Sequence, residues 1–109
     1  MPESTKSPAE VLGAAADLLE KPGAWTQGAF ARDRMGRPQV SHDHRAICFC
    51  AVGAIYRVSG YGPTATEAIS RLSSQVRRNS IGEWNDKPNR TQAEVVAALR
   101  QASRRGGEA

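Results

Sequence analysis

Two histidines and two cysteines lie within nine residues of this sequence, in the stretch HDHRAICFC. His42, His44, Cys48 and Cys50 are side chains of the types that bind zinc. Structural zinc sites usually follow Cys-x2–4-Cys and His-x3–5-His spacings, whereas a single residue separates each pair here. If the cysteines lie on a helix, residues two apart point to nearly opposite sides and cannot share one ion. The four residues are candidate metal ligands, but their spacing favours no metal, and we expect no cofactor.

A cysteine nucleophile is the second chemistry that this stretch could support. Cys48 falls in the first turns of a helix that we expect from residue 46, and a helix N-terminus lowers the pKa of a thiol. Either histidine could act as a base, with Asn85 or Asp86 to orient it, as in a cysteine-dependent hydrolase. Free cysteines are more often small buried hydrophobic residues, so we expect Cys48 and Cys50 to pack in the core. The sequence therefore favours a protein without enzymatic activity, and the hydrolase is an alternative.

Positive charge is unevenly distributed along the chain. Residues 1–44 carry five Lys or Arg against six Asp or Glu, whereas residues 45–109 carry ten against five. A basic half is compatible with nucleic acid as a partner. Cations near the expected third helix and the loop after it could form a phosphate-facing patch: Arg71, Arg77, Arg78, Lys87 and Arg90. Trp84 could stack on an unpaired base beside them, so a nucleic-acid-binding accessory protein is a further alternative.

Two segments outside the expected helices place a tryptophan beside amides and charged side chains. Loops that combine aromatic rings with fixed polar groups are common recognition surfaces. The alternative is that each indole covers the core and that Asn85 and Asp86 only shape a turn. Our leading hypothesis is a small cytoplasmic, non-enzymatic binding or regulatory domain. We expect it to contact a protein partner through Trp25, Gln27, Arg32, Trp84, Asn85 and Asp86.

The elements that position these residues are mostly helices. Three capping-box patterns predict helix starts: Ser7 with Glu10, Thr64 with Glu67, and Thr91 with Glu94. The first helix is expected over about residues 8–21, the third ends near Arg77 and Arg78, and the last reaches about Arg104. The stretch between the third and last helices contains a possible short strand and a turn.

A long apolar run at residues 46–58 predicts a central helix that is buried on all sides. Asp43 is expected to cap its start and Gly60 to end it. Gly53 costs about 1 kcal/mol relative to alanine in a helix. We therefore expect another element to cross the helix closely at Gly53.

A small β element is expected between the first helix and the central one. GAFARD and RPQVS flank a turn at Arg34, Met35 and Gly36, which predicts a β-hairpin or an irregular β element over residues 24–41. Pro38 restricts the second arm to the edge of a sheet. The predicted fold is mainly α, or α+β, with about four helices in total, of which the buried one at about 46–58 is the centre.

The length of 109 residues predicts one globular domain over residues 8–104. We expect residues 1–7 to be a flexible N-terminus and residues 105–109 a disordered tail. The longest apolar run is too short to cross a bilayer, and the N-terminus has no signal-peptide pattern. Two cysteines one residue apart are a poor disulfide framework, so a reducing cytoplasmic location without membrane attachment is expected.

Three motifs give the sequence a resemblance to a known family. WTQGA at 25–29, Cys-Ala-x-Gly-Ala at 50–54, and Trp84-Asn85-Asp86 leading into a Thr-capped helix follow one another in order. Over about residues 8–103 the chain resembles an uncharacterised family of small bacterial and phage proteins, a domain of unknown function. The resemblance implies an accessory or regulatory role, with association with phages or mobile elements, and it assigns no activity, cofactor or partner.

Overall fold

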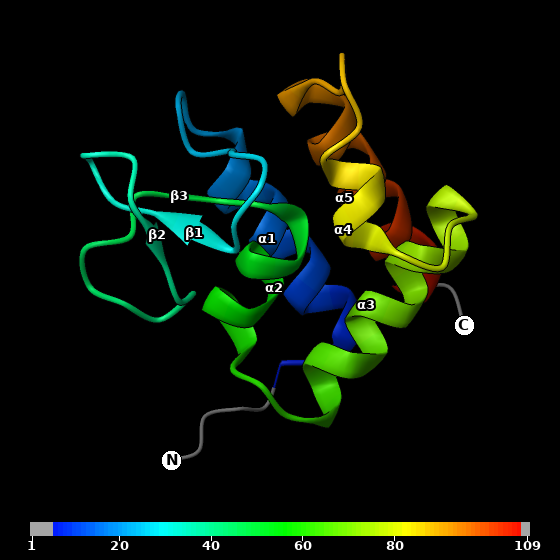
Figure 1. Ribbon diagram of the computed structural model, residues 1–109. Coiled ribbons are helices and arrows are strands. Elements are labelled where there is room, and N and C mark those ends of the chain that lie inside the picture. Colours follow the sequence, from blue (N-terminus) through cyan, green and yellow to red (C-terminus); the bar gives the residue numbers. More distant parts are fainter. Residues whose placement is uncertain (1–5, 108–109) are drawn as a thin grey trace.

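The computed structural model describes residues 6–107, which form five helices and a small three-stranded antiparallel sheet (Figure 1). The mainly helical, α+β fold predicted from the sequence is confirmed, with one more helix than expected. In chain order, the elements are α1 (Pro8–Glu20), β1 (Ala31–Arg32), β2 (Pro38–Gln39), β3 (Cys48–Phe49), α2 (Ala51–Ser59), α3 (Pro63–Val76), α4 (Ile81–Asn85) and α5 (Gln92–Gly107).

Helix α1 starts as its sequence predicts and lies at the centre of the helical part. The side chain and backbone of Ser7 exchange hydrogen bonds with Glu10, which completes the capping box. One side of α1 is buried against α2, α3 and α5. α5 runs antiparallel to α1, because Gln92 at its start donates to the carbonyl of Leu19 while Ser103 near its end donates to that of Ala9.

The sheet lies at one side of the molecule, away from α4 and α5 (Figure 1). Its strand order is β2-β1-β3, and β1 pairs antiparallel with both neighbours. The predicted hairpin is confirmed, with Ala31 opposite Gln39, and Pro38 lies on an edge strand as expected. The third strand was not predicted from the sequence.

The central helix begins later than predicted, at Ala51 in place of residue 46. Cys48 and Phe49 form β3, and the Cys50 thiol caps the helix by accepting a hydrogen bond from Gly53 N at 3.3 Å. The prediction failed because the backbone of this segment pairs elsewhere. For example, Phe49 N donates to the carbonyl of Ala24 at 2.8 Å. Ala51 and residues 53–55 of α2 are buried, whereas Val52 and residues 56–59 are half-buried, so the expected burial on all sides is also wrong.

Gly53 allows the close crossing that the sequence predicts, although the crossing element is not a helix. A Cβ atom on Gly53 would lie 1.9 Å from the carbonyl oxygen of Phe30 and 2.8 Å from its carbonyl carbon. The same oxygen accepts a hydrogen bond from Cys50 N at 3.1 Å. The chain entering β1 therefore lies directly against α2, and only glycine fits at this contact.

The remaining helix boundaries show which local signals held. Thr91 and Glu94 form the predicted capping box of α5. The box predicted for Thr64 and Glu67 does not form, because α3 starts one residue earlier with Pro63, and Glu67 pairs with Arg71 at 3.2 Å instead.

The possible strand before Trp84 is the short helix α4, and α5 continues to Gly107, beyond the predicted end at Arg104. Of the expected flexible segment and tail, residues 1–5 and 108–109 lie outside the described residues, whereas Ser7 caps α1 and residues 105–107 belong to α5. Within residues 6–107, no helix combines the length and the hydropathy that crossing a membrane requires.

Candidate functional site

The two tryptophan segments lie side by side and are joined through the fully buried side chain of Asn85. Its Oδ1 accepts hydrogen bonds from Trp25 Nε1 at 2.8 Å and from Ala51 N at 3.0 Å. Its Nδ2 donates to the carbonyl of Thr26 at 3.1 Å and to the carboxylate of Asp86 at 2.9 Å. The four bonds use the full capacity of a side-chain amide. Asn85 therefore fastens the loop before β1 to both α2 and α4.

Gln27 and Asp86 extend this Asn85 network. Gln27 Nε2 donates to the carbonyls of Asn85 at 2.9 Å and of Lys87 at 3.1 Å. Asp86 Oδ1 also accepts a hydrogen bond from Gly28 N at 3.0 Å. Asp86 is exposed, and within residues 6–107 no hydrogen bond uses its second oxygen, Oδ2. Its carboxylate is therefore fixed in place with one oxygen available to a partner.

Arg32 connects the same loop to the hairpin. From β1, its guanidinium donates to Thr26 Oγ1 at 3.2 Å, to the carbonyl of Gln27 at 3.0 Å and to that of Gly36 at 3.0 Å. The side chain is half-buried and is directed towards these acceptors rather than into solvent. Arg32 is thus engaged in positioning the loop.

Trp84 is half-buried against the core, and Arg90 covers one face of its ring at 4.3 Å from the ring centre. Arg90 Nε also donates to the carbonyl of Trp84 at 2.9 Å, and Arg90 forms an ion pair with Glu94 at 3.5 Å. The ring face of Trp84 that Arg90 covers is therefore not accessible to a partner, and neither is the guanidinium face that lies on the ring.

The structure therefore brings together the six residues for which a partner-binding role is predicted. Most of their polar groups, however, form hydrogen bonds within the protein, between the loop before β1 and the segment 84–87. Trp25 agrees with the alternative interpretation, in which the indole covers the core, because its N–H donates to the side-chain oxygen of Asn85. Asp86 alone among the six is both exposed and left with an unused acceptor oxygen.

The two cysteines differ from the expected arrangement. Cys48 lies in β3, so the argument from a helix N-terminus does not apply to it, and its half-buried thiol contacts the carbonyl of Arg32 at 3.9 Å. Cys50 occupies the cap position instead. Burial raises the pKa of the Cys50 thiol, and this outweighs the lowering by the backbone N–H groups of Gly53 and Val52. Cys50 is therefore a protonated, buried thiol at neutral pH.

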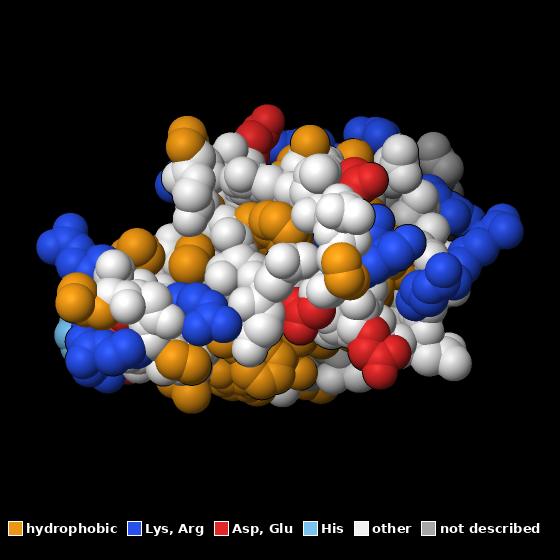
Figure 2. Space-filling model, turned by 45° about the horizontal axis from the view of Figure 1, so that its top comes forward, with side chains coloured by type: hydrophobic (Ala, Val, Ile, Leu, Met, Phe, Trp, Pro, Cys, Tyr) orange, Lys and Arg blue, Asp and Glu red, His pale blue; other side chains and the backbone are white. Residues whose placement is uncertain are grey.

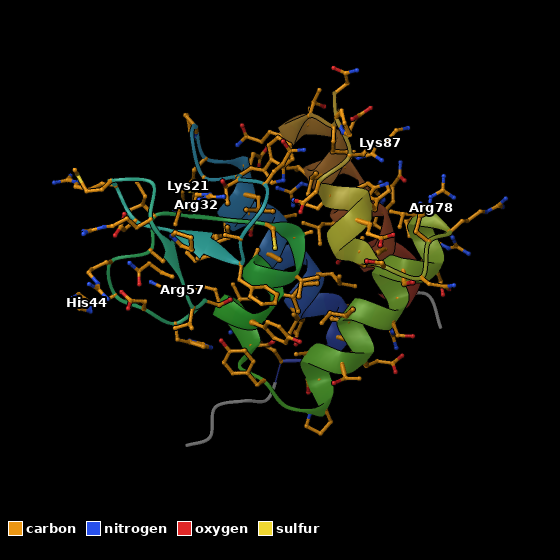
Figure 3. The ribbon with its side chains drawn as sticks, in the orientation of Figure 1. Lys21, Arg32, His44, Arg57, Arg78 and Lys87 are labelled. Carbon is orange, nitrogen blue, oxygen red and sulfur yellow. The ribbon has the colours of Figure 1, made fainter. Side chains whose placement is uncertain are left out.

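The histidines lie in the exposed loop between β2 and β3. The ring of His42 meets the ring of Tyr61 edge-on, with centroids 5.3 Å apart. His44 lies at the far end of this loop (Figure 3). In the part of the chain that the structure describes, no three His, Cys, Asp or Glu side chains are grouped so as to hold a metal ion.

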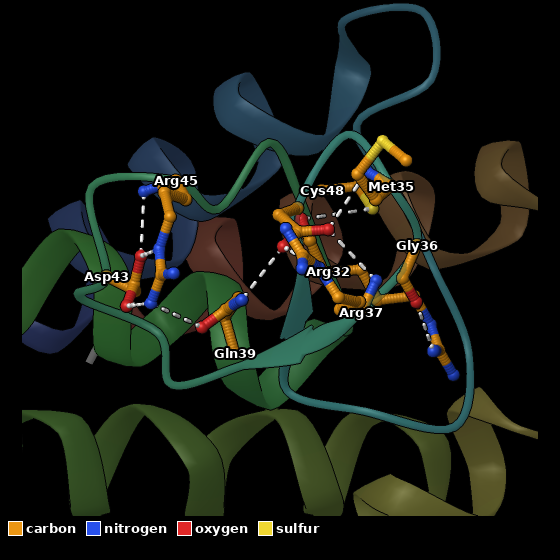
Figure 4. Close-up of polar contacts among 9 residues, drawn as sticks. Arg32, Met35, Gly36, Arg37, Gln39, Asp43, Arg45 and Cys48 are labelled. Atoms are coloured by element: carbon orange, nitrogen blue, oxygen red, sulfur yellow. Dashed lines mark hydrogen bonds and ion pairs between the residues drawn. The ribbon is translucent and has the colours of Figure 1, made fainter.

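A second polar cluster, which the sequence did not reveal, organises the hairpin around the buried carboxylate of Asp33 (Figure 4). Its oxygens accept from the backbone N–H groups of Met35 and Arg37 and from the side chains of Arg37 and Gln39, at 2.9–3.0 Å. These bonds, the backbone bond from Arg37 foremost, lower the pKa of Asp33 to about 2.

Asp43 does not cap α2, contrary to the prediction, because α2 starts eight residues further along the chain at Ala51. The guanidinium of Arg45 instead donates two hydrogen bonds of 2.9 Å to the Asp43 carboxylate (Figure 4). These bonds hold the pKa of the Asp43 carboxyl well below its usual range. The charge of Asp43 is therefore matched within its own loop.

A groove of about 730 Å³, here called the apolar groove, lies beside the Asn85 network. Phe30 and Val40 are its large hydrophobic side chains, and they are 53% and 64% exposed. It is lined by residues 28–30, 38–40, Asp43, Cys50, Gly82 and Asp86. The volume and the mostly hydrophobic lining with few polar groups are typical of binding sites.

The cations predicted to face phosphate fall into two groups. Arg71 and Arg90 form ion pairs with Glu67 and Glu94, respectively. By contrast, Arg77, Arg78 and Lys87 form no ion pair within residues 6–107. Arg78, Lys87 and Arg90 line a second groove, of about 930 Å³, beside Trp84.

One family model, described as a family of unknown function (DUF6197), matches residues 3–105, which is nearly the whole chain. The chain belongs to DUF6197. No curated protein and no solved structure matches it. The family match covers all elements of the fold up to the last turn of α5, including the Asn85 network and both grooves.

Sequence reasoning about this DUF6197 chain missed the two side chains that shape the apolar groove. Phe30 directly follows the WTQGA motif, and Val40 follows the edge strand, but neither position has a local signal of exposure. Their exposure results from tertiary structure, since β1 and β2 carry them to one side of the sheet. A single exposed hydrophobic residue is normal on a protein surface, whereas two that line one groove are informative.

Proposed function

We propose that this domain is a small non-enzymatic binding module and that its apolar groove holds a segment of a partner protein. The observation that carries the proposal is the exposure of Phe30 and Val40 in one groove beside the fixed carboxylate of Asp86. An accessory or regulatory role in the cytoplasm of bacteria, or of cells carrying phages and mobile elements, is part of the proposal.

The hydrophobic side chains supply the main driving force in this proposal. Fully covering a Phe or Val side chain contributes about 1.5–3 kcal/mol, and Phe30 and Val40 are each little more than half exposed. A partner that covered both would therefore gain about 2 kcal/mol from these two contacts, which corresponds to more than tenfold in affinity.

Charge suggests which partner segment fits the groove. Its two carboxylates are Asp43, which is matched by Arg45, and Asp86, which keeps Oδ2 available. A segment that places a Lys or Arg beside a hydrophobic side chain would complement both features of the groove. We therefore propose a basic and hydrophobic peptide segment as the occupant.

Selection of peptides from a random library on the domain tests this proposal. The isolated peptides are then titrated by fluorescence anisotropy against Val40→Glu, which charges the groove, and against Met35→Glu as a matched control. Met35 is 72% exposed and lies outside the groove. We expect Val40→Glu to weaken binding about tenfold or more, and Met35→Glu to bind like the wild type. Failure to enrich peptides, or equal loss in both variants, would contradict the proposal.

Asp86→Asn separates the charge from the geometry of the same site. The amide oxygen still accepts the bond from Gly28 N, while the negative charge is removed. We expect selected peptides to bind this variant several-fold more weakly and with a smaller dependence on salt. Unchanged affinity would show that the groove binds hydrophobic segments without a requirement for a cation.

A further inference from the structure

Five lysine and arginine side chains gather where α3 and α5 end and where α4 is followed by a loop. None of the five forms an ion pair within residues 6–107. They are Arg77, Arg78, Lys87, Arg104 and Arg105, and all are exposed. We call them the basic surface.

Contacts between the helix ends bring Arg105 beside the end of α3, which Arg77 and Arg78 follow. Gln75 of α3 donates to Gln101 of α5 at 2.7 Å and accepts from Arg105 at 3.0 Å. Arg78 and Lys87 line the same groove of about 930 Å³. Figure 3 shows Arg78 and Lys87 on one side of the molecule, and Figure 2 shows Lys and Arg side chains gathered at the corresponding end.

Compensation of helix dipoles explains only part of this charge. The C-terminal end of a helix carries about half a negative charge, so α3 and α5 together offset about one of the five positive charges. Glu83 and Asp86 line the same groove and offset two more. Among the described residues, a surplus of about two positive charges remains on this surface. Elsewhere, by contrast, Arg100 bonds to Asp17 at 3.0 Å and also to Glu20.

The backbone conformation of Arg77 is a second sign that the positive charge of this surface has a role other than stabilising the fold. Arg77 is the C-cap of α3 with φ of 59°, a left-handed conformation in which glycine is usual and other residues are strained. Asn89, in the loop after α4, has φ of 73°, and these two are the non-glycine residues of positive φ in the described chain. An arginine at a position that favours glycine lowers stability but adds a charge to the basic surface.

We infer that the basic surface binds the phosphate backbone of nucleic acid through its charge and without reading the base sequence. Guanidinium groups bind phosphate oxygens with two parallel hydrogen bonds, and lysine acts as a point charge. Asn79 and Ser80 line the same groove and add neutral polar groups. The cations come from three separate segments, an arrangement that suits a line of phosphates better than a single acidic side chain. This inference does not depend on the apolar groove.

Fluorescence anisotropy with labelled, mixed-sequence oligonucleotides tests the inference on the full chain. Single-stranded and duplex probes are titrated separately over a series of salt concentrations. Each phosphate contact contributes about −0.7 (single strand) to −0.9 (duplex) to the slope of log K against log salt, so four contacts predict a slope of about −3 to −4. Binding of either probe with such a slope supports the inference, and the stronger probe identifies the preferred form. No binding of either at low salt would overturn it.

Matched charge variants locate the binding surface. Arg78→Gln with Lys87→Gln removes two charges from the basic surface. Lys21→Gln with Arg34→Gln removes two exposed charges elsewhere, after the end of α1 and in the turn of the hairpin. We expect the first pair to reduce the salt slope by about 2 and the second pair to leave it nearly unchanged. An equal effect of both pairs would mean that only net charge matters and would overturn the inference.

Two further measurements separate this surface from folding and from an acidic protein partner. Arg77→Gly is expected to bind oligonucleotide about threefold or more weakly while its resistance to urea rises, because glycine relieves the left-handed strain. Loss of both binding and stability would assign Arg77 a structural role and count against the inference. Polyglutamate is the competitor. If it displaces the oligonucleotide at an equal concentration of charge, the partner is an acidic protein, and the inference is wrong.

Discussion

Replacing Gly53 with alanine tests the closest backbone contact in this fold, and two physical effects predict opposite signs. Alanine is the better helix former, so helix propensity alone predicts that the variant is more stable by up to about 1 kcal/mol. The structure predicts a loss, because the added Cβ atom would lie 1.9 Å from the carbonyl oxygen of Phe30.

The magnitude follows from what has to move. Ordinary contacts of a Cβ atom begin at 3.4 Å, so the Phe30 carbonyl must retreat by about 1.5 Å. Its hydrogen bond from Cys50 N, 3.1 Å long, is then broken, and leaving a buried backbone pair unsatisfied costs about 1–3 kcal/mol. Overpacking of the core adds about 1–3 kcal/mol. After subtraction of about 1 kcal/mol for the gain in helix propensity, we expect a net loss of about 1–5 kcal/mol.

Urea denaturation followed by circular dichroism measures this change as a shift of the unfolding midpoint. The matched control is Gly82→Ala in α4, where the nearest atom to the added Cβ is the Ser80 hydroxyl at 3.9 Å. That substitution meets no backbone, so the control should keep or slightly raise the stability of the protein. A Gly53→Ala variant as stable as the wild type, or more stable, would refute the close contact and with it the placement of the chain entering β1.

Three further substitutions test other parts of the structure. Asn85→Asp removes two hydrogen-bond donors, including the one to the Thr26 carbonyl, and places a buried negative charge near the Asp86 carboxylate. We expect the free energy of unfolding, measured by urea denaturation at neutral pH, to fall by about 3 kcal/mol. The loss should be smaller at a pH where the new carboxyl is protonated. Arg77→Gly should raise the free energy of unfolding by about 0.5–1 kcal/mol, because it relieves a left-handed backbone; a decrease would contradict the assigned strain. The pKa of Asp33 is lowered to about 2 in the folded state, so the stabilisation from its charged form is present above about pH 4 and is lost as the pH falls towards 2. Asp33→Asn should therefore flatten the dependence of the unfolding midpoint on pH in that window, and an unchanged dependence would assign the acid sensitivity to other groups.

Elements with strong local signals could be predicted from the sequence, and those that depend on distant pairing could not. Ser7 and Thr91 cap their helices within a few residues, so the pattern and the structure agree. β3 forms because Cys48 and Phe49 pair with β1, which lies 16 residues earlier or more, and no local pattern distinguishes two such residues from the start of an apolar helix. α4 has only five residues, too few to show helical periodicity.

The residue types of the candidate site could be picked out from the sequence, but not the direction of their side chains. Trp25 and Trp84 were expected on two recognition loops. Their segments lie side by side, although Trp84 itself belongs to the short helix α4. The sequence could not show that Asn85 is fully buried between them, since exposure depends on how α2 and α4 pack. The exposure of Phe30 and Val40 was missed for the same reason. In the sequence each is an ordinary hydrophobic residue, and its exposure depends on the arrangement of the sheet.

The antiparallel pairing of α1 with α5 joins the first and the last of the described helices to be synthesised. α1 leaves the ribosome before the other described elements, whereas α5, which covers much of its hydrophobic side, is made last. Seventy-one residues separate Lys21 from its hydrogen-bonding partner Gln92. At about 5–20 residues per second, α1 therefore waits roughly 4–14 seconds for this helix. Throughout that interval, the part of its hydrophobic side that α5 covers is open to chaperones and to neighbouring nascent chains, so the core of this domain is completed only once α5 has been made.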